Sequence, residues 1–280
     1  MLSLVLSSIL LVQAERVWAV PDLAVGPIPE GKLDPFRKDF QKYANVFGVH
    51  VFATERVPDE KVRHVAAVMA EYLDNDEDGR PDNPLIAAAL ADRDAYMVMT
   101  YGERGIERID PERLHREGFH AGQFQFATET NPGGDEFDAT LEEVLHLITA
   151  HGWANAYPAI WGERRGTEVA TCVDRARGGH FVEVPRRYPE QAWFSYDDES
   201  CEYQCMITEY IYWALTSLLG AQAGEDRCEE ISNEWRACTP ASLKRKDPWI
   251  VSMLQRPEFR LPTQLPDGTY TPAIKKVEKP

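Results

Sequence analysis

The chain has 280 residues, of which 46 are Asp or Glu and 30 are Lys or Arg, so its formal net charge is −16. This excess of acidic residues argues against nucleic acid and anionic membrane surfaces as partners, because both repel a negatively charged protein. An acidic surface of this kind suits a secreted protein. The length is sufficient for one large domain with a full hydrophobic core.

The first part of the chain has the pattern of an export signal. Residues 1–12 form an apolar run that is too short to span a bilayer as a mature helix. Small residues follow, and Val17-Trp18-Ala19 fits a cleavage site, with Ala14 as a second candidate. We therefore predict a secretory signal peptide at 1–19 and a secreted or periplasmic single domain at 20–280, with no membrane insertion after signal removal. The run lacks a preceding Lys or Arg, so an uncleaved or buried N-terminus is the alternative.

The remaining chain divides into a part with strands and a later helical part. The predicted elements, in chain order, are a short helix at 35–43, a strand at 47–53, helices at 58–72 and 84–93, strands at 95–100 and 119–128, a helix at 138–152, and helices at 167–177, 201–219 and 232–237. The tail from 257 is rich in Pro and is expected to lie extended over the surface. Strands with helices first and helices afterwards favour a single α+β domain.

An acidic segment separates the helices predicted at 58–72 and 84–93. Its carboxylates recur along a tight loop that also contains Gly79, and they belong to Asp74, Asp76, Asp78 and Asp82. Calcium prefers about six to eight oxygen ligands, and a glycine permits the sharp turn that such a loop needs. The segment resembles the calcium loop of EF-hand-like proteins, which implies a structural calcium ion held by these four carboxylates. Leu85 stands where an EF-hand has its bidentate Glu, and an acidic solvated turn is the alternative.

The helix predicted at 138–152 is amphipathic. Its apolar face consists of Leu141, Val144, Leu145 and Ile148. Asp138 or Thr140 is expected to cap the start of this helix, and Gly152 is expected to end it. The helix is therefore predicted to bury one face in the core and to leave an adjacent arc for polar residues.

That arc carries two carboxylates and an imidazole. At about 100° of rotation per residue, Glu142, Glu143 and His146 lie on one side of the helix, whereas His151 points away. The stretch Glu142-Glu143-Val144-Leu145-His146 resembles the His-Glu-x-x-His helix of zincin-type zinc metallopeptidases, with Glu in place of the first His. The resemblance implies that Glu142 and His146 bind zinc or another transition metal and that Glu143 is the general base. The order of a sheet-bearing half, an active-site helix and a helical half also resembles the zincin layout.

A third ligand is expected from a later helix, because zincins of the gluzincin kind take a Glu from such a position. The helix predicted at 201–219 is apolar almost all round, as expected of a buried helix, and Glu209 lies inside it. A buried carboxylate needs a cation or a hydrogen-bond donor. Glu209 is therefore the predicted third metal ligand. Pairing with an Arg, or exposure beside Glu202 and Thr216, is the alternative.

Other patterns leave two further possibilities for a metal site. His120 or His180 could replace Glu142 as a ligand, and Glu143-Val-Leu-His146 also fits the Glu-x-x-His motif of di-iron carboxylate bundles. Such bundles need two pairs of this kind. The nucleophile elbow of serine hydrolases, the Walker loop and the Rossmann fingerprint are absent.

Five cysteines occur in the chain: Cys172, Cys201, Cys205, Cys228 and Cys238. An oxidising compartment favours disulfides, and the odd count leaves one thiol over. We expect at least one disulfide, and Cys228–Cys238 is the favoured pair because ten residues bring its ends together readily. The chain has no Cys-x-x-Cys pair, so a structural zinc knuckle is not predicted.

Two functions are compatible with these features. The first is a secreted metal-dependent hydrolase, a zincin-like peptidase acting on a peptide or other extracellular substrate, with calcium for stability. The second is a secreted, non-enzymatic calcium-binding or interaction protein whose zincin-like helix has lost hydrolysis. Metal content distinguishes them: calcium with a transition metal favours the first, and calcium alone favours the second.

Overall fold

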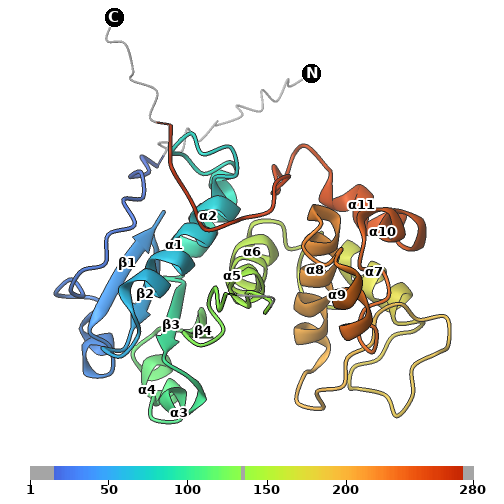
Figure 1. The fold of residues 1–280 in the computed structure, drawn as a ribbon, viewed down its shortest axis with the longest axis horizontal. Coiled ribbons are helices and arrows are strands. Elements are labelled where there is room, and N and C mark those ends of the chain that lie inside the picture. The colour runs from blue at the N-terminus through green and yellow to red at the C-terminus, as the bar shows by residue number, and fades with distance from the viewer. Residues whose placement is uncertain (1–15, 134–135, 274–280) are drawn as a thin grey trace, which may run out of the picture.

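The computed structural model describes residues 16–133 and 136–273 (Figure 1). Its elements, with η1 a 3₁₀ helix and η2 a π-helix, are η1 (Asp34–Lys38), β1 (Lys42–Val46), β2 (Val49–Ala53), α1 (Asp59–Leu73), α2 (Pro84–Ala91), β3 (Tyr96–Thr100), α3 (Glu103–Ile106), α4 (Pro111–Arg116), β4 (Gly122–Phe126), α5 (Thr140–Leu147), η2 (Ile148–Trp153), α6 (Ala154–Ala156), α7 (Glu168–Ala176), α8 (Tyr203–Leu219), α9 (Glu225–Glu230), α10 (Pro240–Lys246) and α11 (Pro248–Leu254). The named strands all precede α5, and the named elements from α5 onward are helices. This arrangement confirms the predicted α+β class.

The strands form one mixed sheet in the order β1-β2-β3-β4. β1 runs antiparallel to β2, whereas β2, β3 and β4 are parallel to one another. The turn Phe47-Gly48 joins β1 to β2, and both of its residues have positive φ, as a tight hairpin turn requires. The parallel strands need longer connections, which α1 with α2 and then α3 with α4 provide.

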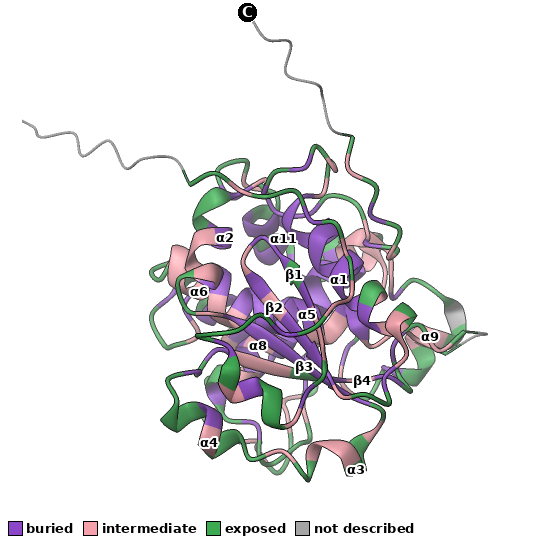
Figure 2. Ribbon diagram, turned by 90° about the vertical axis from the view of Figure 1, so that its left-hand side faces the viewer, coloured by how far each residue is buried: buried purple, intermediate pink, exposed green. Residues whose placement is uncertain are grey.

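Helices cover the two faces of the sheet differently. On one face α1 packs against β1 and β2, and the larger hydrophobic core lies there. The other face carries a smaller aromatic cluster, in which Phe36 of η1 stacks on Phe52 of β2 with ring centroids 3.9 Å apart. Figure 2 shows mostly buried residues in the sheet, α1, α5 and α8, mostly exposed ones in α4, and exposed and intermediate ones in α3.

The helix α5 lies between the sheet-bearing half and the helical half (Figure 1). It packs against α1 and β4 on one side and against α8 on the other. In the helical half, α7, α10 and α11 pack around α8. The facing surfaces of α5 and α8 are therefore inside the molecule, where their polar side chains must find partners.

The helix predicted at 35–43 is confirmed only in its first part, through residue 38, and is wrong for the rest. The chain forms only the short η1 and then extends into β1. Phe36 and Phe40 have helical spacing, but both are buried in the aromatic cluster on the sheet. From Lys42 onward the chain pairs with β2 instead of continuing the helix.

The helix predicted at 232–237 is also wrong, because this segment forms turns between α9 and α10. The buried Trp235 makes an isolated β-bridge with Phe194, which an α-helical backbone could not provide. Thr239 then starts α10 with a capping box. The elements α3, α4, α9, α10 and α11 were not predicted from the sequence, whereas the extended tail after 257 is confirmed through residue 273.

The predicted end of the central helix at Gly152 is wrong as well. The helix passes through the π-helical turn η2 and continues into α6. A Cβ atom at Gly152 would lie 3.0 Å from the side chain of Ile86 and 3.2 Å from that of Leu90. Gly152 therefore allows η2 to approach α2 closely rather than ending the helix.

Two disulfides constrain the helical half. Cys228–Cys238 forms as predicted, and Cys201–Cys205 is an additional bond at the start of α8. Cys172 is the remaining free cysteine and is buried. Disulfides are typical of proteins from oxidising compartments. Among the described helices, none has the length and apolar character of a membrane span.

The predicted signal peptide at 1–19 lies mostly outside the described residues. Residues 16–19 are described and lie extended against the domain: Arg16 pairs with Asp92 at 2.6 Å, and the Trp18 ring meets Phe47 edge-on. Cleavage after Ala19 would remove both contacts. The signal peptide stays a prediction.

Candidate metal centre

The start of α5 is fixed by a charged cap. Asp138 accepts hydrogen bonds through Oδ1 from the backbone N–H groups of Thr140 and Asn131. Its Oδ2 lies 2.6 Å from Nε2 of His64 on α1. This contact anchors the first turn of α5 to α1, so the arc of polar residues that follows has a fixed direction.

The second contributing helix is α8, which is buried along most of its length. Glu209 lies in its middle and is 7% exposed. The predicted alternatives do not hold, because Glu209 is neither exposed nor paired with an Arg among the described residues. It faces His146 of α5, with 3.4 Å between Glu209 Oε2 and His146 Nε2.

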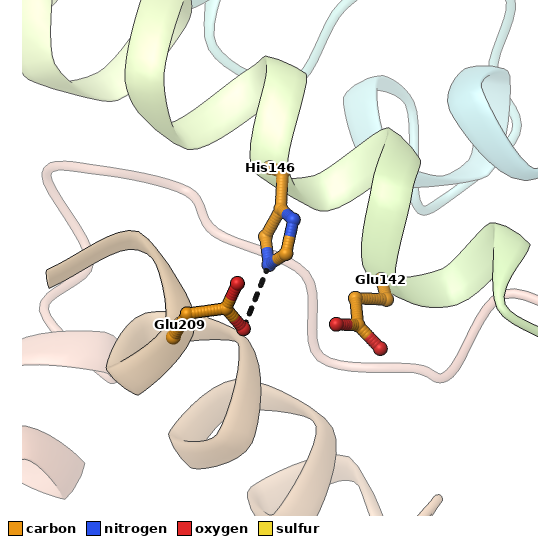
Figure 3. Close-up of side chains that lie close together, drawn as sticks. All are labelled: Glu142, His146 and Glu209. Carbon is orange, nitrogen blue, oxygen red and sulfur yellow. Dashed lines mark ion pairs between the residues drawn. The ribbon is translucent and has the colours of Figure 1, made fainter. Parts of the chain in front are cut away.

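Glu142, His146 and Glu209 converge on one point between α5 and α8 (Figure 3). Each offers a ligand atom, and these atoms all lie within 4.8 Å of one another. The Nε2 atom of His146 is fully buried and has no hydrogen-bond partner among the described residues. A buried polar atom without a partner is expensive, so this nitrogen requires a proton shared with the carboxylates or a cation. The donor set of one imidazole nitrogen and two carboxylates fits a divalent transition metal.

Glu143 occupies a different position from the other three. Its Oε2 lies 3.7 Å from Nδ1 of His146, on the imidazole nitrogen opposite the one that faces Glu209. Gln123 of β4 donates a hydrogen bond to the same oxygen. Glu143 is thus placed as the outer partner of the histidine, which is how carboxylates commonly orient metal-binding imidazoles. Its side chain is 21% exposed, so solvent reaches this edge of the site.

Burial and the neighbouring charges favour the protonated forms of Glu142 and His146. Burial raises the pKa of Glu142 to about 7, and the negative charges of Glu209 and Glu143 act in the same direction against the opposing effect of His146. Burial alone would lower the pKa of His146, but the carboxylates of Glu209, Glu143 and Glu142 outweigh it and hold this pKa well above its ordinary value. Below about pH 7 a metal cation must therefore displace protons from both residues.

We expect the affinity for a transition metal to decrease as the pH falls, and to decrease more steeply below about pH 7 than above it. Above this pH, binding displaces the proton of His146, whereas below it the proton of Glu142 must leave as well. Competition with a chromophoric chelator across this range measures the slope. An affinity that does not change with pH would contradict protonation of this cluster.

Glu209 has a partner of its own. The hydroxyl of Tyr196 donates to Glu209 Oε1 at 3.1 Å, which leaves Oε2 facing His146. Tyr196 is held in turn by Tyr188, whose hydroxyl donates to its backbone carbonyl at 3.0 Å. Neither Tyr196 nor Gln123 was identified from the sequence, since both lie far along the chain from the residue they contact and belong to no motif.

Replacing Tyr196 by Phe is expected to weaken metal binding by about 10–100-fold, the usual cost of losing a hydrogen-bond partner of a ligand. The metal affinity of the folded variant measures this effect. Tyr188→Phe is the matched control, because its hydroxyl contacts the backbone carbonyl of Tyr196 and the guanidinium of Arg177 but no carboxylate of the site. An equal loss in both variants would assign the effect to the position of the loop instead of the Tyr196 hydroxyl.

The other histidines considered as ligands lie elsewhere. His180 contacts Asp174 at 3.1 Å, and His120 lies beside the ring of His115. His151 borders a pocket with Arg93 and is outside the converging group, as its direction on the helix predicted. Among the described residues, Glu142 therefore keeps its place in the group with His146 and Glu209.

The acidic loop forms the second group of possible metal ligands. Carboxylate oxygens of Asp74, Asp76 and Asp78 lie within 4.8 Å of one another. Asp82, a predicted fourth ligand, is not a member of this group in the described chain, and its Oδ2 accepts a hydrogen bond from the backbone N–H of Asn75 at 2.7 Å. Burial raises the pKa of Asp74 to about 6.

The backbone of the loop turns around Asp74. Its two oxygens accept from the backbone N–H groups of Asp78 and Gly79 at 3.1 Å and 2.9 Å. Glu77 and Gly79 both have positive φ, which gives the sharp turn predicted at the glycine. Leu85 lies in the first turn of α2, with 56% of its surface exposed, and offers no ligand.

Comparison with known proteins found no match: no protein family, no curated protein and no solved structure resembles this chain closely enough to be assigned to it. The two groups of acidic and histidine side chains are therefore the basis for assigning a function. One group joins the two halves of the molecule through α5 and α8, and the other lies in the loop between α1 and α2.

Proposed function

We propose that the protein is a secreted metal-dependent hydrolase, peptidase-like in its chemistry, with a structural calcium site. The observation that carries this proposal is the buried Nε2 atom of His146, which lacks a hydrogen-bond partner among the described residues and faces two carboxylates. The two disulfides support export, because they are typical of oxidising compartments. A peptide or other extracellular substrate is the proposed partner.

Glu142, His146 and Glu209 would hold the metal. A bound divalent transition metal supplies a Lewis acid that polarises a carbonyl and lowers the pKa of water. The protein contributes the rest: Glu143 accepts a proton at the partly exposed edge of the site, Gln123 holds Glu143, and Tyr196 holds Glu209.

The ligand set indicates a range of metals rather than one. Zinc accepts such ligands, but two carboxylates and one imidazole form a harder donor set than most zinc sites have. Manganese and iron therefore compete with zinc here. Calcium is proposed for Asp74, Asp76 and Asp78, whose oxygens are the ligands that calcium prefers.

One observation favours the non-enzymatic alternative. The carboxylate of the proposed base, Glu143, already lies beside Nδ1 of His146 and accepts a hydrogen bond from Gln123, so it is engaged in positioning the histidine. A protein of this alternative kind would keep the calcium loop and bind extracellular partners without hydrolysing them.

Metal analysis of the purified protein tests the proposal. We expect one calcium and one transition metal per chain, because the two groups of ligands differ in donor type. Calcium without a stoichiometric transition metal would reject the hydrolase and favour the binding protein. The Asp76→Ala protein should lose only the calcium, which assigns each ion to its group.

A further inference from the structure

We infer that residues 260–273 form a strap that ties the two halves supplying the metal centre, and that calcium in the acidic loop strengthens this tie and thereby the transition-metal site. The inference rests on the proposed function. It assigns a role to the C-terminal segment, which the predicted chemistry leaves without one. Figure 1 shows this segment leaving the helical half and crossing to α1 and the loop beyond it.

One anchor of the strap is a buried carboxylate at the end of α1. Glu71 is 5% exposed, and its two oxygens accept three backbone N–H groups of the strap. These come from Asp267, Gly268 and Thr269, at 2.8, 2.9 and 2.8 Å. Hydrogen bonds to an ionised carboxylate are roughly twice as strong as neutral ones, so Glu71 holds the strap firmly.

The acidic loop provides the remaining anchors. Asn75 accepts through Oδ1 from the backbone N–H groups of residues 263 and 264, and Glu77 accepts through its side chain and its backbone carbonyl from those of residues 271 and 273. The hydroxyl of Tyr270 donates to Asp74 Oδ2 at 2.6 Å. Tyr270 is itself buried, so the strap lies on the loop instead of passing above it.

The strap connects the helices that carry the metal ligands. At its start it follows α11, which packs on α8, the helix of Glu209. At its end it is bonded to α1, which packs on α5, the helix of Glu142 and His146. Phe259, just before the strap, accepts a hydrogen bond at its carbonyl from Asn83 at 2.6 Å. The strap is therefore a second link between α5 and α8, in addition to the chain that joins them.

Calcium acts on this link through the conformation of the loop. The grouped carboxylates of Asp74, Asp76 and Asp78 repel one another, and a cation removes that repulsion. The same loop conformation presents Asn75 and Glu77 to the strap. Binding that orders the loop therefore favours the docked strap, and by reciprocity the docked strap favours calcium.

The experiment compares calcium-free and calcium-saturated full-length protein in two measurements. Trypsin cleavage after Arg260 reports whether the strap is docked, and titration with cobalt(II), followed by visible absorption, reports affinity at the transition-metal site. We expect calcium to raise the melting temperature, to slow cleavage after Arg260 and to tighten cobalt binding by about tenfold. Asp76→Ala should abolish all three effects.

Two further variants distinguish the effect of strap docking from the effect of calcium in the loop. Glu71→Gln removes the charge that holds three strap amides, and it should speed cleavage and weaken cobalt binding even with calcium present. Glu60→Gln makes the same change at an exposed position of the same helix and should behave as wild type.

Each other outcome has a distinct meaning. If calcium raises the melting temperature but leaves cobalt affinity unchanged, the calcium site stands and the coupling is overturned. If calcium has no effect on the melting temperature, the calcium part of the proposed function fails. If calcium-free Glu71→Gln and calcium-free wild type also bind cobalt with equal affinity, the role of the strap is overturned as well. Absence of cobalt binding in wild type rejects the transition-metal centre and the inference together.

Discussion

Replacement of His146 by Ala is expected to abolish transition-metal binding and hydrolysis together. The imidazole is the one nitrogen ligand of the converging group, and its removal leaves Glu142 and Glu209 facing each other across the gap between α5 and α8. The loss of metal affinity should exceed the roughly 10–100-fold that removing an outer partner of a ligand costs. Metal content and turnover of a peptide substrate are the two measurements.

His151→Ala is the matched control for this prediction. His151 lies further along the same continuous helix, in η2, and it is half-buried outside the converging group. Its replacement should leave metal content and turnover unchanged. A His146→Ala protein that retains wild-type metal content would show that the metal binds elsewhere, and the hydrolase proposal would then lose its basis.

The residues of the candidate metal centre that the sequence predicts are those whose position depends on local periodicity. Glu142 and His146 are one helical turn apart, so helix geometry alone puts them on one arc. Glu209 was predicted because an acid within an apolar helix needs a partner. The structure brings these three together. Whether they bind a metal stays a prediction.

The residues that the sequence did not reveal depend on contacts between distant segments. Tyr196 reaches Glu209 from a connection before α8, and Gln123 reaches Glu143 from β4. Neither contact has a periodicity or a motif. The strand β1 was missed for a related reason, since it forms by pairing with β2, a contact that its own residues do not reveal in a local pattern.

The same distinction applies to the acidic loop. The turn at Gly79 and the grouping of three aspartates follow from local sequence, and the structure has both. The orientation of Asp82 toward Asn75, and the strap that lies on the loop, arise from packing across the whole chain. Loop residues that look like surface ligands in the sequence therefore also act as hydrogen-bond acceptors for the C-terminal segment.

Glu143→Gln is expected to lower turnover by about 10²–10⁴-fold while keeping the metal, if Glu143 is the general base. The amide has nearly the size of the carboxylate, so the helix and its contact with Gln123 impose no new steric demand. Kinetics and metal content of the same preparation measure the two quantities separately. If Glu143 is the general base, excess metal does not restore the turnover of the variant, because the missing group is the proton acceptor.

The position of Glu143 beside Nδ1 of His146 gives a second effect that the same variant resolves. If the main role of this carboxylate is instead to fix the tautomer that leaves Nε2 free for a metal, its loss weakens metal affinity by about 10–100-fold. If turnover of Glu143→Gln recovers when metal is in excess, Glu143 orients the histidine and another group accepts the proton. Gln123→Ala is the companion variant, because it keeps the carboxylate and removes only its donor. Near-normal turnover in Gln123→Ala with a large loss in Glu143→Gln would assign the effect to the carboxylate itself.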